Sequence, residues 1–389
     1  MKRVLSICLS ALTIITAIFP TSVAAQAVSA PTTSAKSAIL IDADSGETLY
    51  EQDADIKLQI ASTTKILTAL VVLERCRLDE TVVIKPAYTT VEGSSMYLKA
   101  GEKRTVRELL YGLMLSSGND AAVALACHTA GSIDDFAKLM NATADKLGCA
   151  NSDFKNPHGL DAAGHGSTAS DLAKITAAAM KNPDFAAIVS TKTISVAGRE
   201  LKNHNRLLWD LDGALGVKTG YTKSSGRSLV SCAERDGLRL VCVTLSDPND
   251  WADHASLFDW GFSEYKSFSV TEADVGKLTI PVISGEAAEV SVKTNKDYSF
   301  CFKRDDSIIM TVNVPRFVYA SAVPKIVRGA RAGELVLRRN GEIVTTIPLF
   351  YAATVPLDAN TRLGALERMK WAWYFTNNYA NYTGYRFYG

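Results

Sequence analysis

Residues 58–73 read LQIASTTKILTALVVL, and the organisation of the surrounding chain follows from this stretch. After its first turn the segment is apolar almost all round, and such a helix is normally buried at the centre of a domain. We predict a buried helix over residues 62–73, with Ser62 and Lys65 on one face because positions i and i+3 are neighbours. Burial favours the neutral form of a lysine, which could then accept the hydroxyl proton of the serine.

The Ser62 hydroxyl has a structural alternative, which is to cap the helix by pairing with a backbone N–H. Ser62 and Lys65 form the pattern S-x-x-K, and two further strings with this pattern begin at Ser152 and Ser263. Ser152 precedes a run of turn-forming residues and Ser263 falls at a predicted domain junction, so neither is expected on a packed helix. The unpaired N–H groups of a first helical turn also favour a developing oxyanion, which supports Ser62.

The elements on either side of this segment predict one mixed domain. Residues 37–41 and 47–50 flank a run of turn formers and indicate a β-hairpin. Residues 216–245 are predicted to form strands, of which 229–232 and 238–245 are joined by a turn at Arg235-Asp236-Gly237. Between them we predict helices at 106–115, 120–129, 133–147 with Gly148 as the stop, and 171–180 with Ser170 as N-cap. Strand, helices and strands predict an α/β or α+β domain whose sheet contains both ends of the segment.

From about residue 266 the chain changes to β-branched runs broken by Gly, Pro and Asn, which predicts a second, all-β domain. The final segment is rich in aromatic and basic residues at a helical spacing, which suits a bilayer interface or, alternatively, docking on the protein's own surface. We predict a signal peptide at 1–25, the mixed domain at 26–265, the β-rich domain at 266–358 and an aromatic amphipathic tail at 359–389.

The signal peptide is predicted because Lys2 and Arg3 precede an apolar run that ends before Pro20 and a stretch of small residues. The alternative is an uncleaved membrane anchor, but the run falls short of the ~20 residues that span a bilayer. We therefore expect an exported protein that works outside the cytoplasm. Six cysteines follow the signal without C-x-x-C spacing, and we expect mostly free, buried thiols and no zinc motif.

Composition narrows the function classes. The chain has 389 residues, 47% apolar and 21% charged, which excludes a wholly disordered or collagen-like protein. Its 42 basic and 41 acidic residues balance, and no Lys/Arg-rich block stands out, so a nucleic-acid partner gains no support.

Two further motifs follow in order. Ser117-Gly118-Asn119 occupies a short polar gap between two predicted helices, where a loop can project a hydroxyl and a carboxamide into a cleft. Lys218-Thr219-Gly220 falls on a predicted strand and offers a cation, a hydroxyl and a backbone that a substrate could approach closely. The structural alternative for the first of these motifs is plain helix capping. For the second it is an edge-strand lysine beside a bulge glycine. Because three chance occurrences in this order are improbable, we predict that the three motifs form one site.

These motifs resemble those of the penicillin-binding protein and serine β-lactamase superfamily, which are S-x-x-K, S-x-N or S-D-N, and K-T-G. Within it the chain is similar to the low-molecular-weight D-alanyl-D-alanine carboxypeptidases. The matching stretches are LQIASTTK at 58–65, GSSM at 93–96, LMLSSGND at 113–120, NPHGLD at 156–161 and GVKTGYT at 216–222. The resemblance implies a helix-flanked antiparallel sheet followed by a small all-β domain, and the order of segments extends it over the full length.

The resemblance also implies an activity, namely removal of the terminal D-alanine from peptidoglycan stem pentapeptides through an acyl-enzyme on Ser62. Lys65 would take and relay the proton, Ser117 would pass it toward the leaving amine, and Asn119 would orient the substrate or Lys65. β-Lactam antibiotics would acylate the same serine, and neither a metal nor another cofactor is implied.

The third motif would bind the substrate. Lys218 and Thr219, with Gly220 beside them, would hold the terminal carboxylate, and the N–H groups of Ser62 and Tyr221 would form the oxyanion hole. Some relatives use an additional arginine after this motif, and none occurs in residues 247–260. Arg227 is a weak candidate to replace it.

Three alternative functions stay open. A class A β-lactamase needs a glutamate to activate water, and Glu200 is the only one between Asn119 and Lys218. A metallopeptidase could use His158, His165 and Asp171, or Asp253 and His254, but their spacing matches no H-E-x-x-H helix. A catalytically idle wall-binding protein is disfavoured because all three motifs are chemically intact.

Overall fold

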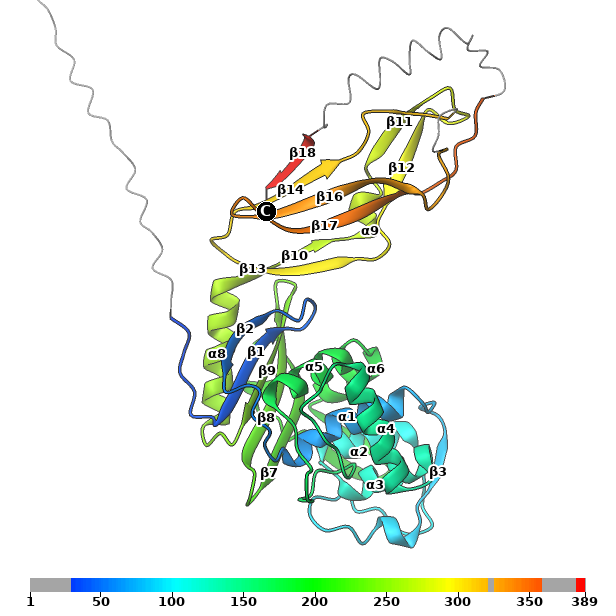
Figure 1. Ribbon diagram of the computed structural model, residues 1–389. Coiled ribbons are helices and arrows are strands. Elements are labelled where there is room, and N and C mark those ends of the chain that lie inside the picture. Colours follow the sequence, from blue (N-terminus) through cyan, green and yellow to red (C-terminus); the bar gives the residue numbers. More distant parts are fainter. Residues whose placement is uncertain (1–28, 321–324, 359–382, 389) are drawn as a thin grey trace, which may run out of the picture.

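The larger part of the protein is built on a five-stranded sheet. A computed structural model describes residues 29–320, 325–358 and 383–388 (Figure 1). The sheet has the strand order β2-β1-β9-β8-β7, with every neighbouring pair antiparallel. Its strands are β1 (Ser37–Asp42), β2 (Thr48–Gln52), β7 (Ala214–Thr222), β8 (Gly226–Arg235) and β9 (Leu238–Leu245). The strands at the start of the mixed domain, β1 and β2, therefore lie in one sheet with the strands near its end, as predicted.

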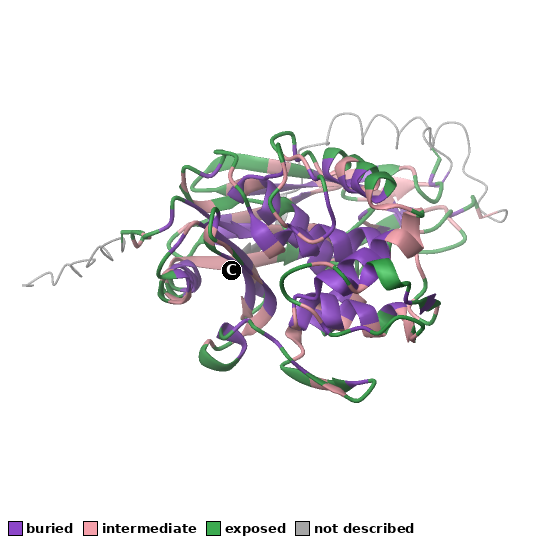
Figure 2. Cartoon of the chain, turned by 90° about the horizontal axis from the view of Figure 1, so that it is seen from below, coloured by how far each residue is buried: buried purple, intermediate pink, exposed green. Residues whose placement is uncertain are grey.

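Helices cover both faces of this sheet. Successive residues of a strand point to opposite faces, so Ile39 and Val241 pack with the main helical group while Leu40 and Leu240 pack with α8. Buried residues accordingly concentrate in the sheet and the helices on it (Figure 2). The helices are η1 (Ala61–Thr64), α1 (Lys65–Leu73), η2 (Pro86–Tyr88), α2 (Val106–Leu115), α3 (Asn119–Ala130), α4 (Ile133–Lys146), α5 (Ala169–Met180), α6 (Pro183–Ser190), α7 (Leu207–Asp210) and α8 (Asp250–Glu264).

Two small hairpins complete this part, β3 (Thr81–Val83) with β4 (Lys103–Thr105) and β5 (Thr193–Val196) with β6 (Arg199–Lys202). Several details differ from the predictions. The α5 helix is capped by Thr168, whose hydroxyl accepts from the Asp171 N–H, and not by Ser170. The α6 and α8 helices and the β5–β6 hairpin were not predicted, because they carry no strong periodic pattern of their own.

The second part is a β domain with its own core. Its seven-stranded sheet has the order β15-β11-β12-β17-β16-β14-β18, and only the β11–β15 pair is parallel among the described strands. The strands are β11 (Thr279–Ile283), β12 (Glu289–Lys293), β14 (Ile308–Asn313), β15 (Val318–Tyr319), β16 (Arg331–Arg339), β17 (Glu342–Tyr351) and β18 (Thr383–Tyr388). The predicted fold class, a helix-flanked antiparallel sheet followed by a small all-β domain, is confirmed; the one described helix here is α9 (Glu272–Val275).

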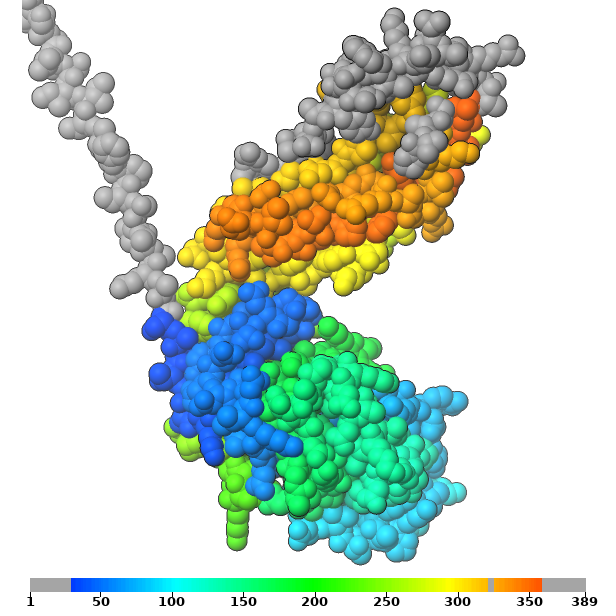
Figure 3. Space-filling view, viewed as in Figure 1, coloured from blue at the N-terminus to red at the C-terminus, as the bar shows by residue number. Residues whose placement is uncertain are grey.

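The two parts join where α8 continues into β10 (Tyr265–Val270), which pairs with β13 (Tyr298–Lys303) (Figure 1). In the space-filling view the yellow and orange β domain lies against the blue N-terminal part of the chain (Figure 3). The Arg304 guanidinium donates to the Phe262 carbonyl at 3.0 Å, and the Arg304 N–H donates to the Glu264 carbonyl at 2.7 Å. Cys301 is buried with the apolar side chains of α8. The junction is thus bonded as well as packed, while the domain boundaries at residues 25, 265 and 358 stay predictions.

Some predictions fall on residues outside those described. The signal peptide and the helically spaced part of the tail lie there, whereas Thr383–Tyr388 form β18 beside β14, a strand that the sequence did not predict. Among the described residues no helix is both long and apolar enough to cross a membrane. All six described cysteines are free, as expected, and four of them are buried while Cys76 and Cys127 are partly exposed.

Candidate active site

Ser62 and Lys65 meet across a tight turn. Ser62 lies in η1, and Lys65 is the first residue of α1, so the prediction of one continuous α-helix from residue 62 is wrong in this detail. A 3-10 turn eclipses the side chains at i and i+3, and Lys65 Nζ lies 2.8 Å from Ser62 Oγ. The N-cap residues are Ile60 for η1 and Thr64 for α1, so Ser62 does not take the capping role that was its alternative.

The Lys65 amine is fully buried and has three polar neighbours. It lies within 2.8 Å of Ser62 Oγ, 2.7 Å of Asn119 Oδ1 and 2.6 Å of the His158 carbonyl oxygen. Burial holds the pKa of Lys65 well below its usual range, the nearby Lys218 lowers it further, and Asp120 opposes the shift. A neutral amine donates two hydrogens and accepts one. Since the amide and carbonyl oxygens can only accept, Ser62 is the contacting group able to donate its proton to Lys65.

The second motif reaches the site at the start of α3. Asn119 Nδ2 donates to the Glu92 carbonyl at 2.7 Å, which turns Oδ1 toward Lys65. The neighbouring Asp120 carboxylate accepts from the N–H groups of Met96 and Leu98, at 3.0 and 2.9 Å, and fastens this loop beside the site. Ser117 is buried just before α3 with a φ of 58°, a strained conformation that clusters at functional sites.

The third motif lies on β7, at the edge of the sheet (Figure 1). A Cβ atom on Gly220 would lie 3.0 Å from the Ile60 carbonyl oxygen and 3.2 Å from the Ser62 nitrogen, so glycine permits the strand to approach η1. Lys218 is buried, its Nζ donates to the Thr219 carbonyl at 2.8 Å, and burial lowers its pKa to about 7. The structure thus brings all three motifs together.

Along β7, backbone N–H groups point alternately toward β8 and toward the open edge of the sheet. The Asp247 N–H donates to the Arg227 carbonyl at 2.9 Å, so the backbone of Arg227 faces β9. Tyr221 is the partner of Arg227 in β7, and the two therefore form a pair without backbone hydrogen bonds between them. The N–H of Tyr221 consequently points to the edge of the sheet that no described strand covers.

The loop at residues 156–165, which contains the NPHGLD stretch, supplies contacts that were not predicted from the sequence. The His158 carbonyl accepts from Lys65, and a Cβ on Gly159 would lie 1.9 Å from the Ala61 carbonyl oxygen. His165 Nδ1 accepts from the Lys155 N–H at 3.0 Å, so its Nε2 carries the hydrogen and donates to Thr64 Oγ1 at 2.9 Å. Burial lowers the pKa of both histidines to about 4. They act here as neutral supports of η1 and α1.

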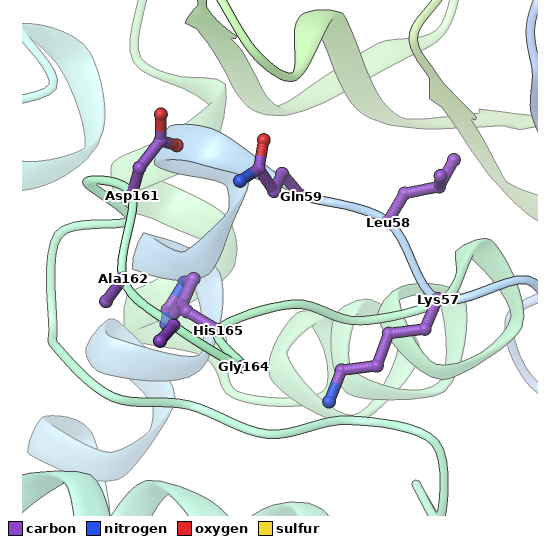
Figure 4. A pocket seen from close by; sticks show the side chains of 8 residues that line it. Lys57, Leu58, Gln59, Asp161, Ala162, Gly164 and His165 are labelled. Atoms are coloured by element: carbon purple, nitrogen blue, oxygen red, sulfur yellow. The ribbon is translucent and has the colours of Figure 1, made fainter.

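An open groove of about 580 Å³ borders the site (Figure 4). Lys57, Leu58 and Gln59 line one side, and residues 161–165 line the other. Asp161 closes the groove toward the end of β7, because Ser224 and Thr222 donate to its carboxylate. The groove therefore carries a cation, Lys57, and an anion, Asp161, and it adjoins the site through the contact of His165 with Thr64.

The residues that the alternative functions would require make other contacts in the structure. Glu200 lies in β6, paired with β5. Asp171 Oδ2 accepts from the Asn151 N–H and from Ser152 Oγ, and His254 Nε2 contacts Thr244. Ser263 Oγ donates to the Trp260 carbonyl at 2.9 Å. Arg227, the weak candidate for the missing arginine, forms a bidentate ion pair with Asp250 at 3.1 and 2.9 Å.

Comparison with known proteins agrees with this arrangement. Residues 24–249 match the S11 peptidase family, described as D-alanyl-D-alanine carboxypeptidase. The D-alanyl-D-alanine carboxypeptidase DacC of Escherichia coli K12 is 34% identical over 357 residues, which cover 86% of this chain and 88% of DacC. DacF of Bacillus subtilis 168, of the same description, is 31% identical over 328 residues, covering 81% of this chain and 84% of DacF.

A solved structure extends the likeness to both parts of the fold. Penicillin-binding protein 5 from Haemophilus influenzae superposes with a TM-score of 0.70 at 26% identity, over 85% of this chain and 99% of that protein. The family match covers more than half of the chain, and the relatives match most of their own length. The chain therefore belongs to the S11 peptidase family of D-alanyl-D-alanine carboxypeptidases.

Proposed function

We propose that this protein is a serine D-alanyl-D-alanine carboxypeptidase that removes the terminal D-alanine from peptidoglycan stem pentapeptides and is acylated by β-lactams. One observation carries the proposal. The buried Lys65 amine lies 2.8 Å from Ser62 Oγ, and its other two neighbours are oxygens that can only accept. A lysine with a lowered pKa in that position is a competent general base for the serine.

The acylation step uses this pair first. Ser62 Oγ attacks the carbonyl carbon of the D-Ala-D-Ala amide while its proton passes to Lys65 Nζ. The carbonyl oxygen becomes an oxyanion, and the N–H groups of Ser62 and Tyr221 donate to it. As the C–N bond breaks, the proton is relayed from Lys65 through the Ser117 hydroxyl to the leaving nitrogen, so D-alanine departs as a neutral amine. Ser62 is left as an ester.

Lys218 and Thr219 anchor the substrate in this proposal. The ammonium of Lys218 and the hydroxyl of Thr219 bind the terminal carboxylate, and Gly220 lets the peptide lie close to β7. Because β7 is an edge strand of the five-stranded sheet, an extended peptide can lie along its open side. Asn119 holds Lys65 through its Oδ1 and is bonded in turn to the Glu92 carbonyl.

Deacylation reuses the same base. Lys65 is neutral again once the amine has left, takes a proton from water, and returns it to Ser62 Oγ as the ester is hydrolysed. The Lys65 amine faces the His158 carbonyl in the loop at residues 156–165, not a carboxylate that could activate water. We therefore expect a long-lived penicillin adduct, in contrast to a β-lactamase.

The decisive experiment measures D-alanine released from a peptide that ends in D-Ala-D-Ala. Ser62→Ala should lower the rate by at least about 10³-fold and abolish the penicillin adduct in the mass spectrum. Ser263→Ala is the matched control, because Ser263 also begins an S-x-x-K string but bonds only locally to Trp260. Full activity in Ser62→Ala, or an equal loss in Ser263→Ala, would reject the assignment.

The location of the protein belongs to the proposal as well. We infer that residues 1–25 are a cleaved signal peptide, that residues 26–265 and 266–358 are the catalytic and β-rich domains, and that the tail at 359–389 attaches to the membrane surface through the helically spaced part that precedes β18. The charge and apolar pattern of both terminal segments supports this. The mass of the exported protein tests cleavage. Truncation after Asp358 should reduce membrane partition, and an unchanged partition contradicts the attachment.

A further inference from the structure

A second cluster of reactive side chains lies away from the catalytic cleft. Cys76 follows the end of α1, Glu80 immediately precedes β3, and His128 lies in the last turn of α3. Their Sγ, carboxylate and imidazole atoms all lie within 4.8 Å of one another, and among the described residues this is the one such group of three. His128 Nε2 lies 3.0 Å from Glu80 Oε2.

The three side chains form a chemically coherent ligand set. Zinc accepts thiolate, imidazole and carboxylate ligands, whose atoms lie roughly 3–4 Å apart around a tetrahedral ion. The cluster is near that size before any side chain moves. A thiolate and a carboxylate would together neutralise a divalent ion. The side chains of His128 and Glu80 are 25% and 36% exposed, which leaves room for water in the fourth position.

Neighbouring groups orient two of the ligands. The Arg77 N–H donates to Glu80 Oε1 at 2.8 Å, which leaves Oε2 facing His128, and this bond is the main cause of the lowered pKa of Glu80. Thr129 Oγ1 donates to the Leu125 carbonyl at 2.8 Å, so it accepts from the Cys76 thiol at 3.3 Å. The bond from Arg77 remains when Glu80 Oε2 binds an ion, and such outer hydrogen bonds hold ligands in place at metal sites. When the Cys76 thiol loses its proton, the Thr129 hydroxyl can turn to donate to Sγ.

We propose that Cys76, Glu80 and His128 bind one Zn²⁺ ion, with water as the fourth ligand. On binding, the Cys76 thiol releases its proton to solvent and a Zn–S bond forms. The hydrogen that joins His128 Nε2 to Glu80 Oε2 moves through solvent to Nδ1 of the same imidazole, so that Nε2 and Oε2 both bind the ion. Lys65 and Asn119 begin α1 and α3, and the proposed site connects the opposite, C-terminal ends of these two helices. Along each helix the site lies roughly 13 Å from the residue that begins it. The ion therefore stabilises the helical part and takes no part in acylation.

The test uses the tag-free full chain after removal of metal by a chelator. Co²⁺ serves as the spectroscopic probe. Titration should produce a thiolate-to-cobalt charge-transfer band that saturates at one equivalent and disappears when Zn²⁺ is added. Zn²⁺ should raise the thermal midpoint of unfolding and leave the rate of penicillin acylation unchanged.

Variants assign the ligands. Cys76→Ser should lose the charge-transfer band, and Glu80→Gln should weaken cobalt binding while keeping the size of the side chain. Cys127→Ser is the matched control, because Cys127 is also partly exposed and adjoins His128 but interacts with Tyr88 instead. The control should keep the band. A band that persists in Cys76→Ser, equal loss in Cys127→Ser, or no saturable band in the wild type would overturn the proposal and leave a simple hydrogen bond between His128 and Glu80.

Discussion

The positive charge of Lys218 lowers the pKa of Lys65, adding to the larger effect of burial on that amine. Both side chains are almost completely buried, Lys65 at the start of α1 and Lys218 on β7. Because two like charges in one cleft are unfavourable, the site favours one neutral and one charged amine. Burial and the charge of Lys218 both lower the pKa of Lys65, whereas burial alone lowers that of Lys218, so Lys65 is the neutral base and Lys218 is left as the cation for the substrate carboxylate.

This division predicts a bell-shaped pH dependence of kcat/KM. Activity should rise with pH as Lys65 loses its proton and fall above about pH 7 as Lys218 loses its charge. Lys218→Arg keeps the charge at all accessible pH values, so the alkaline fall should disappear. Lys218→Met should raise KM at pH 6. The measurement is D-alanine release between pH 5 and 10, and an unchanged alkaline fall in Lys218→Arg would contradict the assignment.

Asn119→Asp should convert the neutral neighbour of Lys65 into an anion. A carboxylate at hydrogen-bonding distance favours the charged amine, so the pKa of Lys65 should rise and the acid side of the profile should shift upward by about 1–3 pH units. Acylation at neutral pH should then fall by roughly 10-fold or more, as measured with a fluorescent penicillin.

Asn141→Asp provides the control for this substitution. Like Asn119, Asn141 donates its amide N–H to a backbone carbonyl, but its Oδ1 accepts from the backbone N–H of Phe154 and not from a lysine, and it lies on α4. Its pH profile should match that of the wild type. A shift of equal size in both variants would mean that the effect is general destabilisation.

His165 should make the fold sensitive to acid. Its pKa is about 4 in the folded protein because of burial, against an ordinary value of 6.5, so the unfolded chain binds more protons between these values. Stability should therefore fall as pH drops from about 6.5 to 4, by an amount on the order of 3 kcal/mol from this residue. His165→Gln should reduce that loss. Urea unfolding at pH 8, 6.5, 5 and 4 measures it, and parallel curves for the two proteins would refute the role of His165.

Phe258→Ala should destabilise the protein without altering the site. Phe258 is fully buried on α8, stacked against Phe262 with ring centroids 6.1 Å apart, on the sheet face opposite to α1. Truncation of a buried phenylalanine costs about 3–5 kcal/mol. Val344→Ala, at a residue 42% exposed, should cost less than about 0.5 kcal/mol. Urea midpoints test both, and penicillin acylation by folded protein should stay at the wild-type rate.

Local signals in the sequence were sufficient for much of the fold. The helix α2 and the strand β9 have the bounds that were predicted, because a capping residue, Thr105, precedes one and a turn at Asp236-Gly237 precedes the other. The sequence did not predict α6, α8 or β18, whose places depend on the sheets that they join. A weak local pattern becomes a helix or strand there only once distant partners are in place.

The reactive groups and their order are properties of the sequence itself. A serine and a lysine three positions apart at a turn can meet because the geometry of one turn is local. Tertiary structure alone decided that the Lys65 amine is buried against Asn119 and His158, which are 54 and 93 positions away. It also decided that Gly220 touches η1 and that Cys76 meets His128. Burial and long-range contact arise only when separate segments pack, and they convert ordinary side chains into a base, an anchor and a set of metal ligands.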